Sequence, residues 1–79
     1  MLLDDKNALV TGGSRGIGFQ VCKIFLENGA RVLAASRNPA SLDGAREALP
    51  GLLTIQADVS VAGDSHRLSA WVHDSWGRL

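Results

Sequence analysis

Short apolar runs alternate along this chain with segments whose apolar residues recur at helical spacing. Three runs have the pattern of strands buried in a parallel sheet, because they are brief, mostly apolar and bounded by glycine, proline or polar residues. They span residues 7–11, 31–35 and 52–57. The remaining segments predict helices over residues 16–28 and 41–49, and a third helix that follows residue 60 and ends at Gly77.

The apolar positions of each predicted helix fall on one stripe, which is the pattern of a helix packed on a sheet. They are Ile17, Val21, Ile24 and Phe25 in the first helix, Leu42, Ala45 and Leu49 in the second, and Leu68, Trp71, Val72 and Ser75 in the third. Gly29 ends the first helix, because glycine tolerates the positive φ found after helix ends.

The order strand-helix-strand-helix-strand-helix predicts an α/β fold with a parallel sheet and right-handed crossovers. It corresponds to a partial Rossmann fold, a doubly wound parallel sheet whose first three strands take the order 3-2-1. A fourth strand, which would pair with the first, is missing from this sequence. We therefore expect residues 1–79 to be the N-terminal part of a single Rossmann domain.

Composition narrows the classes of partner. The chain has 79 residues, of which 46% are hydrophobic and 20% charged, so it has the composition of one small globular domain. Eight basic residues balance eight acidic ones, so no overall field draws the protein to nucleic acid or to an anionic membrane. Any anion site must be local.

The cysteine, the histidines and the tryptophans do not indicate a further functional site. Cys22 has no second thiol for a disulfide or a metal site, and we expect it to fill a buried or half-buried position. His66 and His73 lie seven residues apart, whereas zinc pairs favour three or four, so we expect exposed histidines and no metal site. Trp71 and Trp76 are expected to serve packing, because no basic stripe accompanies them.

The N-terminus predicts no signal peptide, because it turns acidic after two apolar residues and has no basic start. No apolar run approaches the roughly 20 residues that cross a bilayer. Together with the single cysteine, these features predict a cytoplasmic protein.

Glycines cluster between the first strand and the first helix, in the segment Thr11-Gly12-Gly13-Ser14-Arg15-Gly16-Ile17-Gly18. A helix start offers unpaired backbone N–H groups and a positive dipole end, and glycines there let a diphosphate approach. Gly12 allows the tight exit from the strand, Gly16 the approach of the ligand, and Gly18 close packing of the helix. The spacing excludes the P-loop pattern, which needs Gly-Lys followed by Ser or Thr.

The pattern Thr-Gly-x-x-x-Gly-x-Gly at this position resembles the short-chain dehydrogenase/reductase family, and the resemblance covers essentially the whole chain. It implies a nicotinamide dinucleotide cofactor bound by this segment, and hydride transfer between that cofactor and a carbonyl or alcohol. The cofactor-binding positions that it implies here are Gly12, Ser14, Arg15, Gly16, Ile17 and Gly18.

The end of the second strand indicates which dinucleotide is bound. An NAD site usually presents an acid there to the ribose, whereas the 2′-phosphate of NADP calls for positive charge. This chain has Ser36-Arg37 at that place, with no carboxylate between Asn28 and Leu42. Arg37 can meet a phosphate with a fork of donors, and Arg15 resembles the family's second basic position, so we expect NADP(H).

Asp58 and Val59 follow the third strand and resemble the family pair at the adenine ring. The resemblance implies that the carboxylate accepts from the exocyclic amine while the valine lines the pocket. An aspartate at this place is otherwise a common turn former, with Ser60 as a helix cap behind it.

The family's catalytic groups are an Asn-Asn-Ala-Gly segment, a serine and a Tyr-x-x-x-Lys pair. None occurs here, and the sequence contains no tyrosine, so we expect no catalytic residue in this chain. The family is usually homo-oligomeric, but the helices that form its interfaces are not encoded here. An exposed first strand further predicts that the isolated chain is marginally folded.

Three hypotheses remain at this point. The chain is the NADP(H)-binding portion of a reductase, or a stand-alone module that binds NADP(H) or completes a partner's sheet, or a truncated product without activity. The first explains most of the sequence.

Overall fold

Three parallel strands form the central layer of the computed structural model, which describes residues 3–12, 16–58 and 60–77. The strands are β1 (Asn7–Thr11), β2 (Arg31–Ser36) and β3 (Leu53–Gln56). They lie in the order β1-β2-β3, which is the predicted order 3-2-1 read from the other edge. Leu33 of β2 is in register with Leu9 of β1 and with Leu53 of β3.

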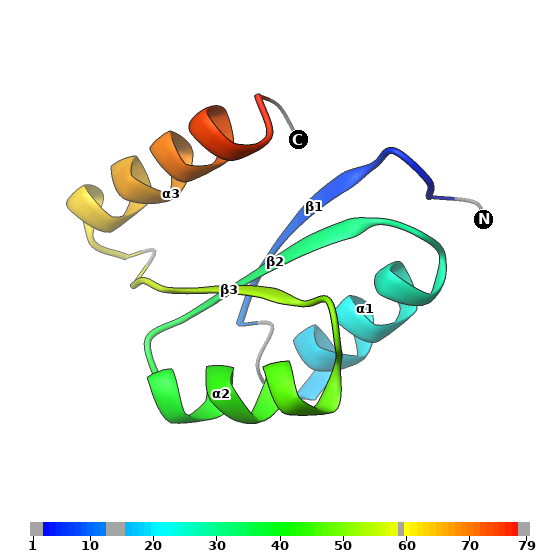
Figure 1. The fold of residues 1–79 in the computed structure, drawn as a ribbon. Helices are drawn as coiled ribbons and strands as arrows, with labels where there is room; N and C mark the ends of the chain where they lie inside the picture. Colours follow the sequence, from blue (N-terminus) through cyan, green and yellow to red (C-terminus); the bar gives the residue numbers. More distant parts are fainter. Residues whose placement is uncertain (1–2, 13–15, 59, 78–79) are drawn as a thin grey trace.

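Helices cover both faces of this sheet (Figure 1). Helices α1 (Gly16–Glu27) and α2 (Pro39–Ala48) lie on one face, and α3 (Ala62–Ser75) lies on the other. Both crossover helices therefore lie on the same side of the sheet, and α3, which follows the last strand, lies on the opposite side. This is the three-layer arrangement of a doubly wound sheet, as the sequence predicts.

Alternation along β2 divides the core into two clusters, because successive side chains of a strand point to opposite faces. Val32 and Ala34 pack with Cys22 on the side of α1 and α2. Leu33 and Ala35 pack on the side of α3, where Leu68 covers them. All four β2 residues are at most 1% exposed, so β2 is the centre of the fold.

The first strand is less buried than its sequence predicts. Residues 7–10 are half-buried and Thr11 is exposed, although the apolar run indicated burial on both faces. Its residues are less buried because β1 is an edge strand: within the described residues it pairs with β2 alone.

The predicted stripe of α1 is also wrong in part. Ile17 is 85% exposed and Ile24 is 52% exposed, whereas Phe25 and Val21 are half-buried. The buried centre of the helix is Cys22, which is inaccessible to solvent as expected. Helical spacing identified the period of α1 but not the face that the sheet covers.

Helix α2 begins two residues before its predicted start. The Asn38 side chain caps it by accepting from the Ala40 N–H at 2.9 Å and the Ser41 N–H at 3.3 Å. Pro39 follows at the first helical position, where its missing N–H costs nothing. The Asn-Pro pair therefore starts a helix as well as ending the strand before it.

Helix α3 buries Leu68 and Val72 and half-buries Trp71, as predicted, but Ser75 is exposed. Its N-cap is Val61, without a side-chain cap, so the expected alternative of a Ser60 cap is wrong. The rings of Trp71 and Trp76 meet edge to face with centroids 5.0 Å apart, and both belong to the core cluster on this side. Their predicted packing role is confirmed.

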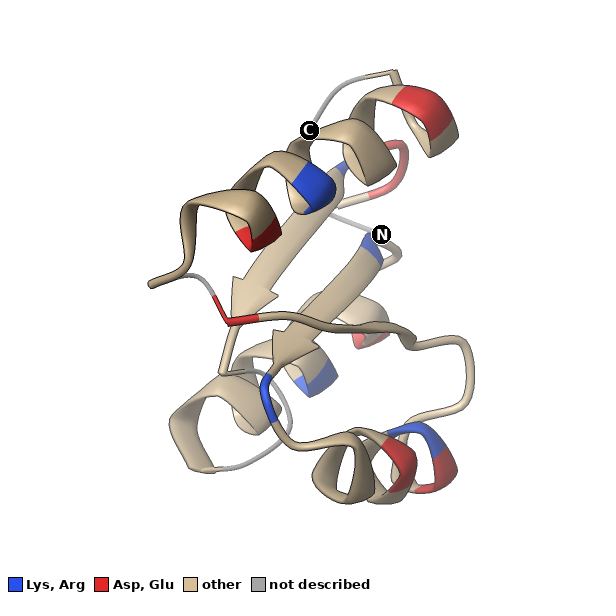
Figure 2. Cartoon of the chain, turned by 90° about the vertical axis from the view of Figure 1, so that its left-hand side faces the viewer, with Lys and Arg blue, Asp and Glu red and all other residues tan. Residues whose placement is uncertain are grey.

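The helix lengths and the distribution of charge are relevant to binding of membranes and nucleic acids. None of the helices within the described ranges is long and apolar enough to cross a bilayer. Charged residues are spread over the helices and loops on both faces of the sheet rather than gathered in one region (Figure 2).

Candidate functional site

The carboxyl ends of all three strands meet at one edge of the sheet. Backbone hydrogen bonds hold them together, because the Gly12 N–H donates to the Ala35 carbonyl at 2.8 Å and the Ala57 N–H donates to the Ser36 carbonyl at 2.9 Å. Gly12 and Arg37, two of the predicted residues, directly follow β1 and β2, and Asp58, a third, is the second residue after β3. In open α/β sheets, ligands bind at this edge.

The glycines beside β1 leave room for a ligand. Gly12 has φ +70° and Gly16 has φ +59°, a region that residues with a Cβ rarely adopt. A methyl group at either position would meet no other atom within 4 Å, and both glycines are exposed. Gly16 is the first residue of α1, so the open space lies at the positive end of a 12-residue helix.

The other positions of this turn divide into two groups. Ser14 and Arg15 lie outside the described residues. Ile17 and Gly18 lie in the first turn of α1, where Ile17 is 85% exposed and Gly18 is half-buried.

The end of β2 presents Arg37 to solvent. Its side chain is 79% exposed. Ser36 before it is half-buried, and its Oγ accepts from the Asn38 N–H at 3.2 Å. The turn from β2 into α2 is thus fixed locally, while the guanidinium of Arg37 remains able to change position.

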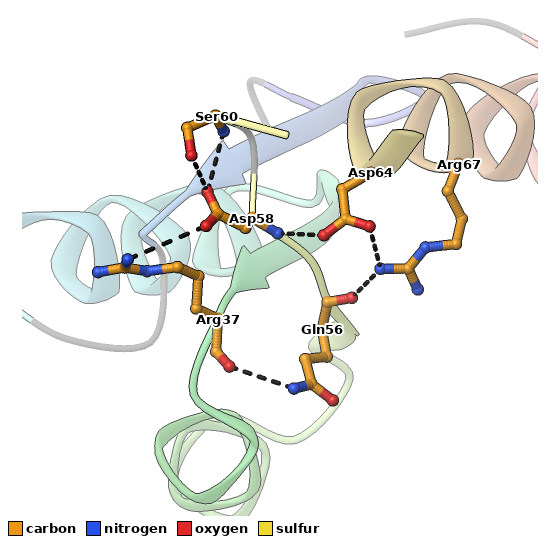
Figure 3. Close-up of polar contacts among 6 residues, drawn as sticks. All are labelled: Arg37, Gln56, Asp58, Ser60, Asp64 and Arg67. Atoms are coloured by element: carbon orange, nitrogen blue, oxygen red, sulfur yellow. Dashed lines mark hydrogen bonds and ion pairs between the residues drawn. The ribbon is translucent and has the colours of Figure 1, made fainter. Parts of the chain in front are cut away.

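The Asp58 carboxylate is held by Ser60 and faces Arg37 (Figure 3). Its Oδ1 accepts from the Ser60 hydroxyl at 2.6 Å and from the Ser60 N–H at 3.0 Å, and its Oδ2 lies 4.0 Å from Nη1 of Arg37. The two Ser60 bonds lower the pKa of Asp58, partial burial opposes them, and the nearby Arg37 charge adds a smaller lowering. Asp58 is therefore an anionic acceptor. Val59, its predicted partner, lies outside the described residues.

A hollow of about 200 Å³ lies beside the ends of β2 and β3. Its lining comprises Arg37, Gln56, Ala57, Asp58 and Asp64. This volume is below the range of about 300–1,000 Å³ that is typical of sites for whole drug-sized ligands, and it suits one part of a larger molecule.

Sequence reasoning missed Gln56 and Asp64. Gln56 occupies the last position of a strand, and Asp64 lies six residues after Asp58, so neither belongs to a recognised motif. One signal was available, since Asp64 and Arg67 have the three-residue spacing of an ion pair on a helix.

A larger groove of about 400 Å³ lies between β1 and α3, and Leu9, Thr11, Leu68 and Val72 contribute to its lining. It follows the edge of β1 and contains none of the charged residues described above. Groups of three or more His, Cys, Asp or Glu side chains that could hold a metal ion are not found among the described residues. His66 and His73 are exposed, as predicted.

Comparison with known proteins gives a consistent result. A family model described as short chain dehydrogenase matches residues 6–79. The sex determination protein tasselseed-2 of Zea mays is 41% identical over 70 residues, which cover 87% of this chain and 21% of that protein. The oxidoreductase DltE of Bacillus subtilis is 37% identical over 79 residues, which cover 100% of this chain and 31% of that protein.

The crystal structure of a short chain dehydrogenase from Bacillus anthracis has the same fold. It matches with a TM-score of 0.90 and 31% sequence identity, over 98% of this chain and 32% of that one. The chain thus spans about a third or less of the length of the relatives described here. Because the family model covers nearly every residue and the strand ends, glycines and helices follow the same plan, this chain belongs to the short-chain dehydrogenase family.

Proposed function

We propose that this chain is the NADP(H)-binding N-terminal part, residues 1–79, of a reductase that transfers hydride between the cofactor and a carbonyl or alcohol. The observation that supports this most is the meeting of Gly12, Arg37 and Asp58 at the carboxyl edge of the sheet. Each follows a different strand, and each matches one part of a dinucleotide. Members of the family use nicotinamide dinucleotides.

The diphosphate is assigned to the start of α1. Gly12 and Gly16 leave open space at the helix N-terminus, where backbone N–H groups and the helix dipole favour an anion. Ser14, Ile17 and Gly18 complete this part of the proposed site. A side chain at Gly16 would occupy the space that the phosphates need.

The 2′-phosphate is assigned to Arg37 and Ser36, with Arg15 as a second cation. Arg37 is exposed, directly follows β2 and has no acid within five residues on either side. An acid at the end of β2 would instead favour the free ribose hydroxyl of NAD(H). The guanidinium fork suits a phosphate dianion better than a ribose.

The adenine ring is assigned to Asp58 and Val59. The Asp58 carboxylate stays ionised because of its Ser60 bonds, so it can accept from the exocyclic amine. The adjacent hollow beside Arg37 and Gln56 is open to that ring.

When bound, the dinucleotide supplies or accepts the hydride. The described residues of this chain bind and orient the cofactor, and we assign no catalytic residue to them. The resemblance implies a tyrosine as proton donor, and residues 1–79 contain none, so the proposal places the donor outside these residues. A cytoplasmic location fits the single buried cysteine.

Calorimetric titration with NADPH and NADH tests the proposal. We expect the protein that carries this chain to bind NADPH more tightly, and Arg37→Asp to abolish the preference by weakening NADPH binding about 100-fold, since charge-assisted bonds of about 1.5–3 kcal/mol are replaced by repulsion. Arg46→Asp on α2 makes the same change in net charge away from the site and should leave the ratio within twofold. An unchanged ratio in Arg37→Asp would remove the 2′-phosphate assignment.

Reading the coding sequence beyond Leu79 is an independent check. Continuation into an Asn-Asn-Ala-Gly segment and a Tyr-x-x-x-Lys pair would support the reductase. Saturable NADPH binding by a protein that lacks both would support a cofactor-binding module instead.

A further inference from the structure

Two charged residues of α3 reach across to the strand ends (Figure 3). Asp64 Oδ2 accepts from the backbone N–H of Asp58 at 2.7 Å, in a half-buried position. Arg67 Nη2 donates to Asp64 Oδ1 at 3.3 Å and to the Gln56 carbonyl at 2.5 Å. One ion pair thus holds the chain on both sides of Ala57, immediately before the turn that presents the Asp58 carboxylate.

The same set of bonds continues to β2. The side chain of Gln56 donates from Nε2 to the Arg37 carbonyl at 3.3 Å. It therefore fixes the backbone of Arg37 and leaves the guanidinium, which is largely exposed, able to turn. Arg37 and Asp58 come from different strands, and this network joins their backbones.

Asp58 is held in two independent ways. Ser60 fixes the direction of its carboxylate, and Asp64 fixes its amide. If the amide lost its acceptor, the Ser60 bonds would still hold the side chain to its own turn, but the turn would no longer be tied to the sheet. A charge-assisted bond to a half-buried N–H is worth more than an exposed ion pair.

We propose that Asp64 and Arg67 are positioning residues for the adenosine end of the cofactor site. They set the place of the Asp58 carboxylate relative to Arg37, so that adenine and the 2′-phosphate are met together. This inference rests on the proposed function. It adds two residues of α3 to a site otherwise built from the turns that follow the strands.

The chain contains a matched control. Asp43 and Arg46 on α2 form an ion pair with the same three-residue spacing. Their side chains are 64% and 54% exposed, and among the described contacts they bond to each other only. The two pairs therefore share chemistry and helical spacing and differ in their contact with the strand ends.

The test measures binding of 2′,5′-ADP, which carries the adenosine and the 2′-phosphate, by calorimetry on the protein that carries this chain. We expect Asp64→Ala, which loses both the bond to the Asp58 amide and the pair with Arg67, to weaken binding about tenfold, and Arg67→Ala to weaken it about threefold to fivefold. Asp43→Ala and Arg46→Ala should stay within twofold. Asp64→Asn, which keeps an oxygen acceptor, should recover most of the affinity.

Loss of helix stability is separated from loss of positioning by a second variant. Val72→Ala removes a buried contact of α3 that lies eight residues along the helix from Asp64. Its thermal midpoint should fall, but its affinity well below that midpoint should stay within twofold. In ¹⁵N spectra, the Asp58 amide proton should move upfield in Asp64→Ala and keep its position in Val72→Ala.

The results distinguish failure of the positioning role from failure of the proposed function. If Asp64→Ala binds 2′,5′-ADP as Asp43→Ala does, or loses no more affinity than Val72→Ala, the positioning role is overturned while the proposed function stands. If Arg37→Ala has no effect on 2′,5′-ADP binding, or the protein does not bind the probe, the proposed function fails and this inference fails with it.

Discussion

At Asp58, the environment of one carboxylate sets its charge. Two Ser60 donors act on Oδ1 and the Arg37 guanidinium faces Oδ2, and the Ser60 bonds lower the pKa of Asp58 most. Since the pKa is lower in the folded chain, the stabilisation is fully present above the ordinary carboxyl value. It is lost as pH falls through the lowered one.

We therefore expect the Asp58 carboxylate to titrate below about 3.9, its ordinary value, and adenosine binding to be constant from about pH 8 to pH 5. Carboxyl ¹³C shifts followed against pH measure the midpoint. Ser60→Ala removes the hydroxyl donor and should raise that midpoint toward the ordinary value. A midpoint at or above 3.9 in the unmodified protein would contradict the assigned hydrogen bonds.

Glycine at position 16 is required by conformation as well as by space. Its φ of +59° places it where a Cβ is strained by about 1–2 kcal/mol. Gly16→Ala should therefore weaken NADPH and NADH binding about tenfold alike, since both share the diphosphate. Calorimetry measures both affinities.

Gly44 on α2 offers the contrasting substitution. It lies inside a helix with nothing within 4 Å of an added Cβ, and it has no positive φ. Gly44→Ala should stabilise the fold by about 0.5–1 kcal/mol through helix propensity and leave binding unchanged. Equal effects of the two substitutions on binding would argue against a diphosphate at Gly16.

Helix α3 is joined to the sheet at three places along its length. Asp64 and Arg67 tie its start to the end of β3, and Leu68 and Val72 bury its middle. At its far end, the Trp76 ring lies 5.8 Å below the guanidinium of Arg31, which also donates to Asn7 Oδ1 at 2.7 Å. The helix therefore spans from the carboxyl ends of the strands to their amino ends.

Trp76→Ala should loosen this far end without disturbing the other face of the sheet. We expect a loss of about 1–2 kcal/mol, because an edge-to-face ring pair and a cation–π contact are each worth about 0.5–1.5 kcal/mol. Amide hydrogen exchange should rise in α3 and stay unchanged in α2. Equal acceleration in both helices would mean that the two core clusters open together.

Across the whole molecule, positive and negative charges balance, so attraction of an anionic ligand depends on individual charged groups near the site. Eight basic and eight acidic residues leave no net field, and both signs are dispersed over the fold (Figure 2). Long-range attraction of a dinucleotide is therefore weak, and affinity for the extra phosphate depends on arginines at contact distance.

This predicts a difference in salt dependence. Raising the salt concentration from about 50 mM to about 500 mM should weaken NADPH binding several-fold more than NADH binding, because only NADPH engages exposed guanidinium groups through its 2′-phosphate. Arg37→Ala should reduce the difference, and Arg15, the second assigned cation, accounts for what is left. Parallel salt curves for both cofactors in the unmodified protein would be inconsistent with an arginine contact.

The amino-acid sequence alone determined the element types, the parallel order of the strands and the glycine turn, because those features depend on periodicity and on local backbone freedom. It also indicated Arg37 and Asp58, since a residue that follows a parallel strand must lie at the carboxyl edge of the sheet. Which residues are buried was harder to predict from the sequence. The pattern of α1 did not distinguish exposed Ile17 from buried Cys22, because a helical period fixes an angle but not the face that its neighbours cover.

Only the tertiary structure revealed the network of Gln56, Asp64 and Arg67. Its bonds join two strands and a helix through backbone groups, and no periodic or motif signal encodes which carbonyl a given arginine reaches. Contacts between segments distant in sequence depend on the twist of the sheet and the path of the crossovers, which the folded chain settles as a whole.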